Sequence, residues 1–123
     1  MKKIVALLLA LVMVFALCAC GAKEDAASDF KAGFIFLHDE NSTYDLNFIN
    51  AAKEACDKLG IEYVMQTNID EGQECYDIAA ELADDGCDLI FADSFGHESH
   101  IIKAAEENPD VQFCHATGTS ASS

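Results

Sequence analysis

The most constraining feature of this sequence is the alternation of short apolar runs with amphipathic segments from residue 31 onward. The run at 33–37 is continuously apolar, as in a strand that is buried on both faces of a sheet. In the segments between the apolar runs, apolar residues recur at the spacing of an amphipathic helix. We therefore expect strands at 33–37, 61–65, 89–92 and 111–114, and helices at 45–59, 71–85 and 98–107.

Because strand and helix alternate, consecutive strands are joined by helical crossovers, which are right-handed and make the strands parallel. The sequence therefore predicts an α/β fold: a Rossmann-like parallel sheet of four strands, with three helices. We expect the strand order 2-1-3-4, in which the topological switch point lies between the first and third strands. The fourth strand would be an uncovered edge, so we expect the chain to be a fragment of a longer protein.

Polar loops follow the strands at the edge where parallel α/β sheets bind ligands. These loops are 38–44 after the first strand, 93–97 after the third and 115–119 after the fourth. The first two contain an aromatic ring among hydroxyl, amide and carboxyl groups, which suits a flat polar ligand. Structural roles are the alternative: Tyr44 and Phe48 could pack on the sheet, and Asp45 could cap the following helix.

The chain is strongly acidic, with 22 acidic residues, seven lysines, no arginine and a net charge of −15. Such a surface repels phosphate backbones, which excludes nucleic acid as a partner. The lack of guanidinium groups also disfavours a highly phosphorylated ligand. A neutral small molecule fits this charge best, although the charge could equally serve only solubility outside the cell.

The N-terminus has the layout of a secretory signal peptide, with Lys2 and Lys3 ahead of an apolar run at 4–17. This run is shorter than the roughly 20 residues of a membrane-spanning helix. The next residues, Leu17-Cys18-Ala19-Cys20, resemble the lipobox of bacterial lipoproteins.

The lipobox resemblance implies that residues 1–19 are removed and that Cys20 carries a lipid. The protein would then be anchored to the cell membrane on its extracytoplasmic face. Residues 20–30 are small and polar, and predict a flexible tether to the domain at 31–123. Ordinary cleavage near Ala19, with release of a soluble protein, is the alternative.

Four further cysteines lie at apolar positions within or beside the expected elements, and none forms a CxxC pair. We expect them to be buried free thiols that pack as small hydrophobic side chains. An exported chain also permits disulfides, and four cysteines allow three pairings. These residues are Cys56, Cys75, Cys87 and Cys114.

The sequence contains no GxSxG elbow, P-loop or GxGxxG motif. We therefore expect neither an enzyme nor a cofactor. His97-x-x-His100 is one metal-like spacing, because residues three apart share a helix face. No closed ligand set accompanies it, so we expect a solvated helix start there rather than a metal site.

Three signatures in order resemble the basic membrane protein (BMP) family, the PnrA-like substrate-binding lipoproteins of ABC transporters. The resemblance covers residues 31–119 and implies the type I periplasmic-binding-protein fold, whose two α/β lobes close over a ligand. The domain at 31–123 would then be an incomplete first lobe. The signatures are Phe34-Ile35-Phe36-Leu37 with Tyr44-Asp45-Leu46-Asn47-Phe48, then residues 86–97, then residues 108–113 with 115–118.

The resemblance implies a solute-binding lipoprotein that captures a small neutral solute, such as a purine nucleoside, for an ABC permease and its ATPase. By position, Phe48 corresponds to an aromatic residue that stacks on a base, and Asp45 to an acidic residue near the ligand. Ile49 departs from the asparagine of many members. A membrane-tethered ligand sensor and a metal-binding lipoprotein are the alternative functions. The candidate ligand-binding residues are Tyr44, Asp45, Asn47, Phe48, Asp93, Ser94, Phe95 and Gly96.

Overall fold

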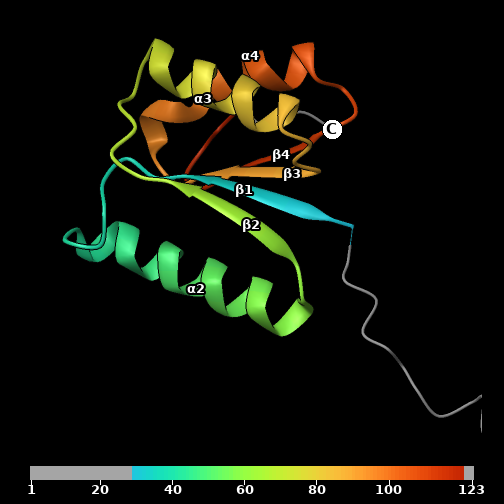
Figure 1. Cartoon of the computed structure of the whole chain (residues 1–123). Helices are drawn as coiled ribbons and strands as arrows, with labels where there is room; N and C mark the ends of the chain where they lie inside the picture. Colours follow the sequence, from blue (N-terminus) through green and yellow to red (C-terminus); the bar gives the residue numbers. More distant parts are fainter. Residues whose placement is uncertain (1–28, 121–123) are drawn as a thin grey trace, which may run out of the picture.

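A computed structural model, which describes residues 29–120, shows one four-stranded sheet with helices on both faces (Figure 1). A short 3-10 helix, η2 (Phe95–His97), precedes the last helix. The strands are β1 (Lys31–Ile35), β2 (Glu62–Gln66), β3 (Leu89–Ala92) and β4 (Gln112–His115). The helices are α2 (Thr43–Leu59), α3 (Gln73–Asp84) and α4 (Glu98–Glu107).

The sheet has the order β2-β1-β3-β4, and all three pairs of neighbouring strands are parallel. This confirms the predicted fold class and strand order. β1 is central, with Ala32 opposite Tyr63 of β2 and Leu89 of β3. The switch point therefore lies between β1 and β3, and the loops that leave these strands start beside each other.

The helices form two layers, with α2 on one face of the sheet and α3 and α4 on the other (Figure 1). Side chains of β1 alternate between the two faces, as a strand requires. Phe34 belongs to the core beneath α2, together with Ile49 and Cys56, whereas Ile35 belongs to the core beneath α3 and α4. Both faces of β1 are therefore buried, which explains its continuous apolar run.

Several predicted boundaries are wrong by one or two residues. β1 was expected at 33–37, but the backbone of Leu37 leaves the sheet and donates to the Asp93 carboxylate at 3.3 Å. The two edge strands β2 and β4 each lie one residue later than predicted, and α3 is shorter at both ends. The strand at 89–92 and the helix at 98–107 have the predicted bounds.

Helix α2 begins before Asp45, the residue predicted to start and cap it. Ser42 is the N-cap, and its side chain accepts a hydrogen bond from the Asp45 N–H. At the other end, Leu59 continues the apolar spacing of Ile49, Ala52 and Cys56 but is 69% exposed. It lies beside Gly60, whose φ of 65° ends the helix.

The four cysteines of the described chain are free thiols, as predicted, and three of them are buried. Cys114, on the edge strand, is only half-buried. Burial raises the pKa of Cys75 to about 12, so this thiol is inert at neutral pH.

Within residues 29–120, no helix is long and apolar enough to cross a membrane. The predicted signal peptide, Cys20 and most of the tether lie outside the described residues.

Candidate ligand-binding edge of the sheet

The loops that follow β1, β3 and β4 are joined by hydrogen bonds at the carboxyl edge of the sheet. The Tyr44 hydroxyl donates to the main-chain carbonyl of Asp93 at 3.0 Å. From the other side, Nε2 of His115 donates to the carbonyl of Ser94 at 2.6 Å. The structure therefore brings together the three loops that the strand pattern predicted to meet.

Asp45 is a fully buried carboxylate in the first turn of α2. It accepts hydrogen bonds from the His38 N–H at 2.9 Å, from Nδ1 of His38 at 3.2 Å and from the Ser42 hydroxyl. Burial alone would raise the pKa of Asp45, but these hydrogen bonds outweigh it and lower the pKa to about 2. Asp45 is therefore ionised at neutral pH and fixes the loop before its helix.

Asp93 is a second fully buried carboxyl group, at the end of β3. Its Oδ1 accepts from the Leu37 N–H, whereas its Oδ2 has no hydrogen-bond partner within the described part of the chain. Burial, and next the negative charge of Asp45, raise the pKa of Asp93 to about 7. Near neutral pH the edge therefore holds one ionised carboxylate beside one carboxyl group that still binds its proton part of the time.

The aromatic candidates differ in how far they are available to a ligand. Phe95 is 64% exposed and Tyr44 is 46% exposed. Phe48 is half-buried, with its ring 5.0 Å from that of Tyr44 and 6.1 Å from that of Phe91. Phe48 thus packs on the sheet in this structure, as in the structural alternative, while Tyr44 and Phe95 present ring surface to solvent.

Two other candidates are held by nearby polar groups. Asn47 is exposed, and its Nδ2 donates to the Thr43 carbonyl within its own helix at 2.7 Å. The Ser94 hydroxyl and the Gly96 N–H both donate to one carboxylate oxygen of Glu71. Sequence reasoning missed Glu71. Its position in the loop after β2, which ends at the same edge of the sheet, was the available signal.

The predicted solvated helix start at His97 is wrong. His97 is fully buried, and its Nε2 donates to the Ile69 carbonyl at 2.8 Å. Burial lowers the pKa of this imidazole, which favours the neutral ring. In residues 29–120, no three His, Cys, Asp or Glu side chains are grouped so that they could hold a metal ion.

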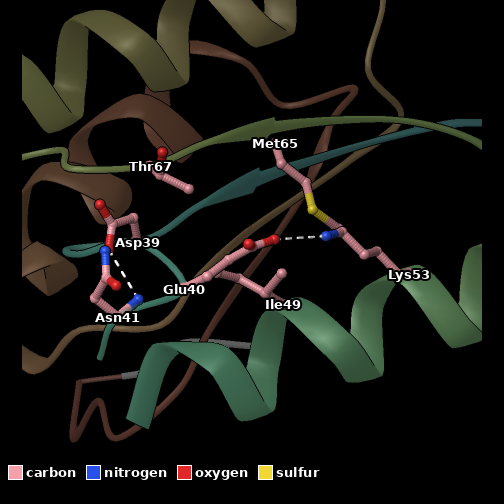
Figure 2. A pocket seen from close by; sticks show the side chains of 7 residues that line it. All are labelled: Asp39, Glu40, Asn41, Ile49, Lys53, Met65 and Thr67. Carbon is pink, nitrogen blue, oxygen red and sulfur yellow. Dashed lines mark hydrogen bonds and ion pairs between the residues drawn. The ribbon is translucent and has the colours of Figure 1, made fainter. Parts of the chain in front are cut away.

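Two hollows are each lined in part by residues of the loops at this edge. One, of about 390 Å³, lies between α2 and the end of β2, where Lys53 and Glu40 form a 2.9 Å ion pair (Figure 2). It is lined by Asp39, Glu40, Asn41, Ile49, Lys53, Met65 and Thr67. The other, of about 880 Å³, runs along α4 and β4. Neither of these two hollows is lined by a candidate contact residue.

No known protein-family profile matches this chain. It is 35% identical over 103 residues to a purine-binding protein of Brucella abortus (strain 2308). This match covers 80% of the chain but only 29% of the relative. The chain therefore spans less than a third of the length of this curated relative.

Two solved structures share the fold. A solute-binding protein of an ABC transporter system from Conexibacter woesei DSM 14684 is 21% identical, with a TM-score of 0.61 over 68% of this chain and 28% of its own. A transcriptional activator of the comK gene from Bacillus halodurans is 18% identical, with a TM-score of 0.66 over 75% of this chain and 31% of its own.

The fold is thus one that a solute-binding protein of an ABC transporter also contains. The relative found by sequence is a purine-binding protein, and one of the two similar structures is a solute-binding protein. The likeness in sequence supports a solute-binding role for the chain, and the likeness to the solved structures shows the fold.

Proposed function

We propose that this chain is the ligand-capturing part of a BMP-family lipoprotein that binds a purine nucleoside for an ABC importer. The main observation in support of this proposal is the 35% identity, over 80% of the chain, to a purine-binding protein. The exposed rings of Tyr44 and Phe95 at the carboxyl edge support it, because a purine base is flat and stacks on aromatic side chains.

The polar groups at the edge suit a neutral ligand with several hydroxyl and amino groups. Asp93 has one carboxyl oxygen without a partner among the described residues, whereas both oxygens of Asp45 are held by His38 and Ser42. The absence of arginine removes the group that would best hold a phosphate. A nucleoside is therefore favoured over a nucleotide.

Capture would be completed by groups beyond this rim. The chain spans 29% of the relative, and neither of the two hollows is lined by its candidate residues. We propose that a second lobe closes over the ligand and that the closed protein delivers it to the permease and ATPase. A lipid on Cys20 would keep the protein at the membrane.

The neighbouring genes distinguish import from sensing. ATPase and permease genes beside this one would support import, whereas an adjacent receptor kinase gene would support a membrane-tethered ligand sensor.

A titration with labelled protein tests the ligand class. Residues 20–123 carrying ¹⁵N would be titrated with adenosine, guanosine, ribose and glucose while amide shifts are recorded. We expect nucleoside-dependent shifts confined to the loops 38–44 and 93–97, with Kd above about 1 mM because one lobe leaves much of the ligand in water. Shifts with glucose but not with nucleosides would overturn the assignment. Micromolar binding would overturn the need for a second lobe.

A pair of variants separates rim contact from non-specific binding. Phe95→Ala should reduce the nucleoside-dependent shifts, because it removes the most exposed ring of the edge. Leu59→Ala is the matched control, since Leu59 is 69% exposed at the opposite end of α2. Equal losses in both variants would show that the ring of Phe95 does not contact the ligand.

A further inference from the structure

Phe95 is held by a loop whose backbone is fixed on both sides, although its own side chain projects into solvent. It begins η2, an element of only three residues. The ring is 64% exposed, and no aromatic side chain of residues 29–120 is stacked on it. The backbone that carries this ring is therefore held through Ser94 and Gly96, its two chain neighbours.

Glu71 holds both neighbours with one carboxylate oxygen. Its Oε1 accepts the Ser94 hydroxyl hydrogen bond and, at 3.1 Å, the Gly96 N–H. These same two bonds, that of Ser94 first, lower the pKa of Glu71, so the acceptor is the ionised carboxylate. A hydrogen bond to a charged group is stronger than one between neutral groups.

Gly96 leaves the space that this carboxylate fills. A Cβ added at Gly96 would overlap the carboxyl carbon and both carboxylate oxygens of Glu71. Because these atoms end a flexible side chain, an added methyl group would displace the carboxylate and leave the backbone in place. Gly96→Ala therefore offers a way to remove the contact while Glu71 itself is retained.

Other contacts keep the loop folded when Glu71 is removed. His97 donates to the Ile69 carbonyl at 2.8 Å, and His115 donates to the Ser94 carbonyl at 2.6 Å. Both involve side chains other than Glu71. Loss of the Glu71 carboxylate should therefore loosen the segment 94–96 without unfolding the sheet.

We propose that Glu71 is a positioning residue, which clasps Ser94 and Gly96 and thereby presets the Phe95 ring for stacking on a flat ligand. The stacking part rests on the proposed function. A preset ring loses less conformational entropy on binding, so the clasp raises affinity without touching the ligand.

Hydrogen exchange tests the clasp without any ligand. In the parent chain, the Gly96 amide should be protected, and Glu71→Ala should reduce its protection by about tenfold or more, as expected for loss of a charge-assisted hydrogen bond. Glu71→Gln keeps one acceptor oxygen, so the Gly96 amide should lose less protection in this variant. Gly96→Ala displaces the carboxylate, so the amide of residue 96 should lose protection although Glu71 is retained. Ile90 and Ala92, in the buried β3, should keep their protection in every variant.

Fluorescence reports on the ring position itself. The chain has no tryptophan, so Phe95→Trp introduces a single probe. Adding Glu71→Ala should lower its anisotropy and make it easier to quench with acrylamide. Glu81→Ala is the matched control, because Glu81 is an exposed acidic residue on α3 without a contact to the loop. Unchanged exchange and anisotropy in Glu71→Ala, or an equal change in Glu81→Ala, would overturn the clasp.

The affinity measurement then tests what the clasp is for. Glu71→Ala should weaken adenosine binding by about three- to tenfold, and Glu71→Gln by less, while Glu81→Ala should not change it. An unchanged affinity in a chain with a loosened loop would overturn the role in stacking. If the parent gives no nucleoside shift at all, the proposed ligand fails, and exchange and anisotropy still decide whether Glu71 holds the loop.

Discussion

The Tyr44 hydroxyl donates a 3.0 Å hydrogen bond to the main-chain carbonyl of Asp93, a residue 49 positions away in the chain. This bond joins the loop after β1 to the loop after β3 at the topological switch point. It also holds the ring of Tyr44 at the rim, where the ring is 46% exposed. Two loops that are remote in sequence are thereby kept in one arrangement before any ligand arrives.

Tyr44→Phe removes this hydrogen bond and keeps the ring. Because the bond is partly exposed, we expect a loss of about 0.5–1 kcal/mol in the free energy of unfolding, measured by urea denaturation. Tyr63→Phe is the control, since Tyr63 is a half-buried tyrosine of β2 whose hydroxyl makes no hydrogen bond among residues 29–120. Equal losses in the two variants would show that the Tyr44–Asp93 bond is unimportant for stability.

Asp93 makes the stability of the fold depend on pH. Its pKa is raised from 3.8 to about 7, so the folded chain binds this proton more tightly than the unfolded chain. The contribution is complete below about pH 4, decreases as the pH rises and is lost above about pH 7. Asp93→Asn stays neutral, so its stability relative to the parent should rise over this range by up to about 4 kcal/mol.

Urea denaturation at several pH values between 4 and 8 measures this difference. Asp45 does not produce it, because its pKa is lowered to about 2 and its contribution is lost only as the pH falls below about 4. Asp110→Asn, at an exposed position, is the control for the change in net charge. If Asp93→Asn and Asp110→Asn have the same pH dependence, Asp93 is not the responsible group.

Gly33 allows α3 to approach the middle of β1. A Cβ at this position would lie 3.0 Å from Leu82 Cδ1 and 3.2 Å from Cys87 Sγ, both in the core. Gly33→Ala should therefore destabilise the fold by about 1–3 kcal/mol through overpacking. In a Leu82→Ala background the same substitution should cost less, and a double-mutant cycle by urea denaturation measures the difference. If Gly33→Ala lowers the free energy of unfolding equally in both backgrounds, contact with Leu82 is not the cause of the destabilisation.

Cys20→Ser tests the predicted lipid anchor. The parent, expressed in a bacterium with its first 19 residues, should enter the detergent phase on Triton X-114 partition. Cys20→Ser should move to the aqueous phase, because the acylated thiol is lost. Cys18→Ser is the control and should stay in the detergent phase. An aqueous parent protein would favour ordinary signal cleavage.

The fold was predictable because apolar spacing determines local structure. The continuous apolar run around Phe34 indicated a doubly buried strand, and the spacing of Ile49, Ala52 and Cys56 indicated one helix face. Boundaries were less predictable, because they depend on capping contacts. α2 begins at Thr43 since Ser42 and Asp45 exchange hydrogen bonds, and both residue types are plausible caps in the sequence alone.

The site was predictable only as a set of loops. Strand order places 38–44 and 93–97 at one edge, and the Tyr44–Asp93 bond shows that they meet there. Sequence spacing could not show that His97 is buried and bonded to Ile69, because that contact comes from another crossover. For the same reason, the sequence could place Glu71 in a loop at this edge but could not show that it reaches Ser94 and Gly96.

The sequence by itself determined the order of strands and helices, the parallel sheet and the edge at which its polar loops end. These follow from periodicity and chain direction, which are local properties. Only the tertiary structure decided which side chains share that edge and in what state. The raised pKa of Asp93 and the clasp of Glu71 on the Phe95 loop arise from burial and from contacts between segments more than 20 residues apart. Such effects depend on distances in space, which a linear pattern does not contain.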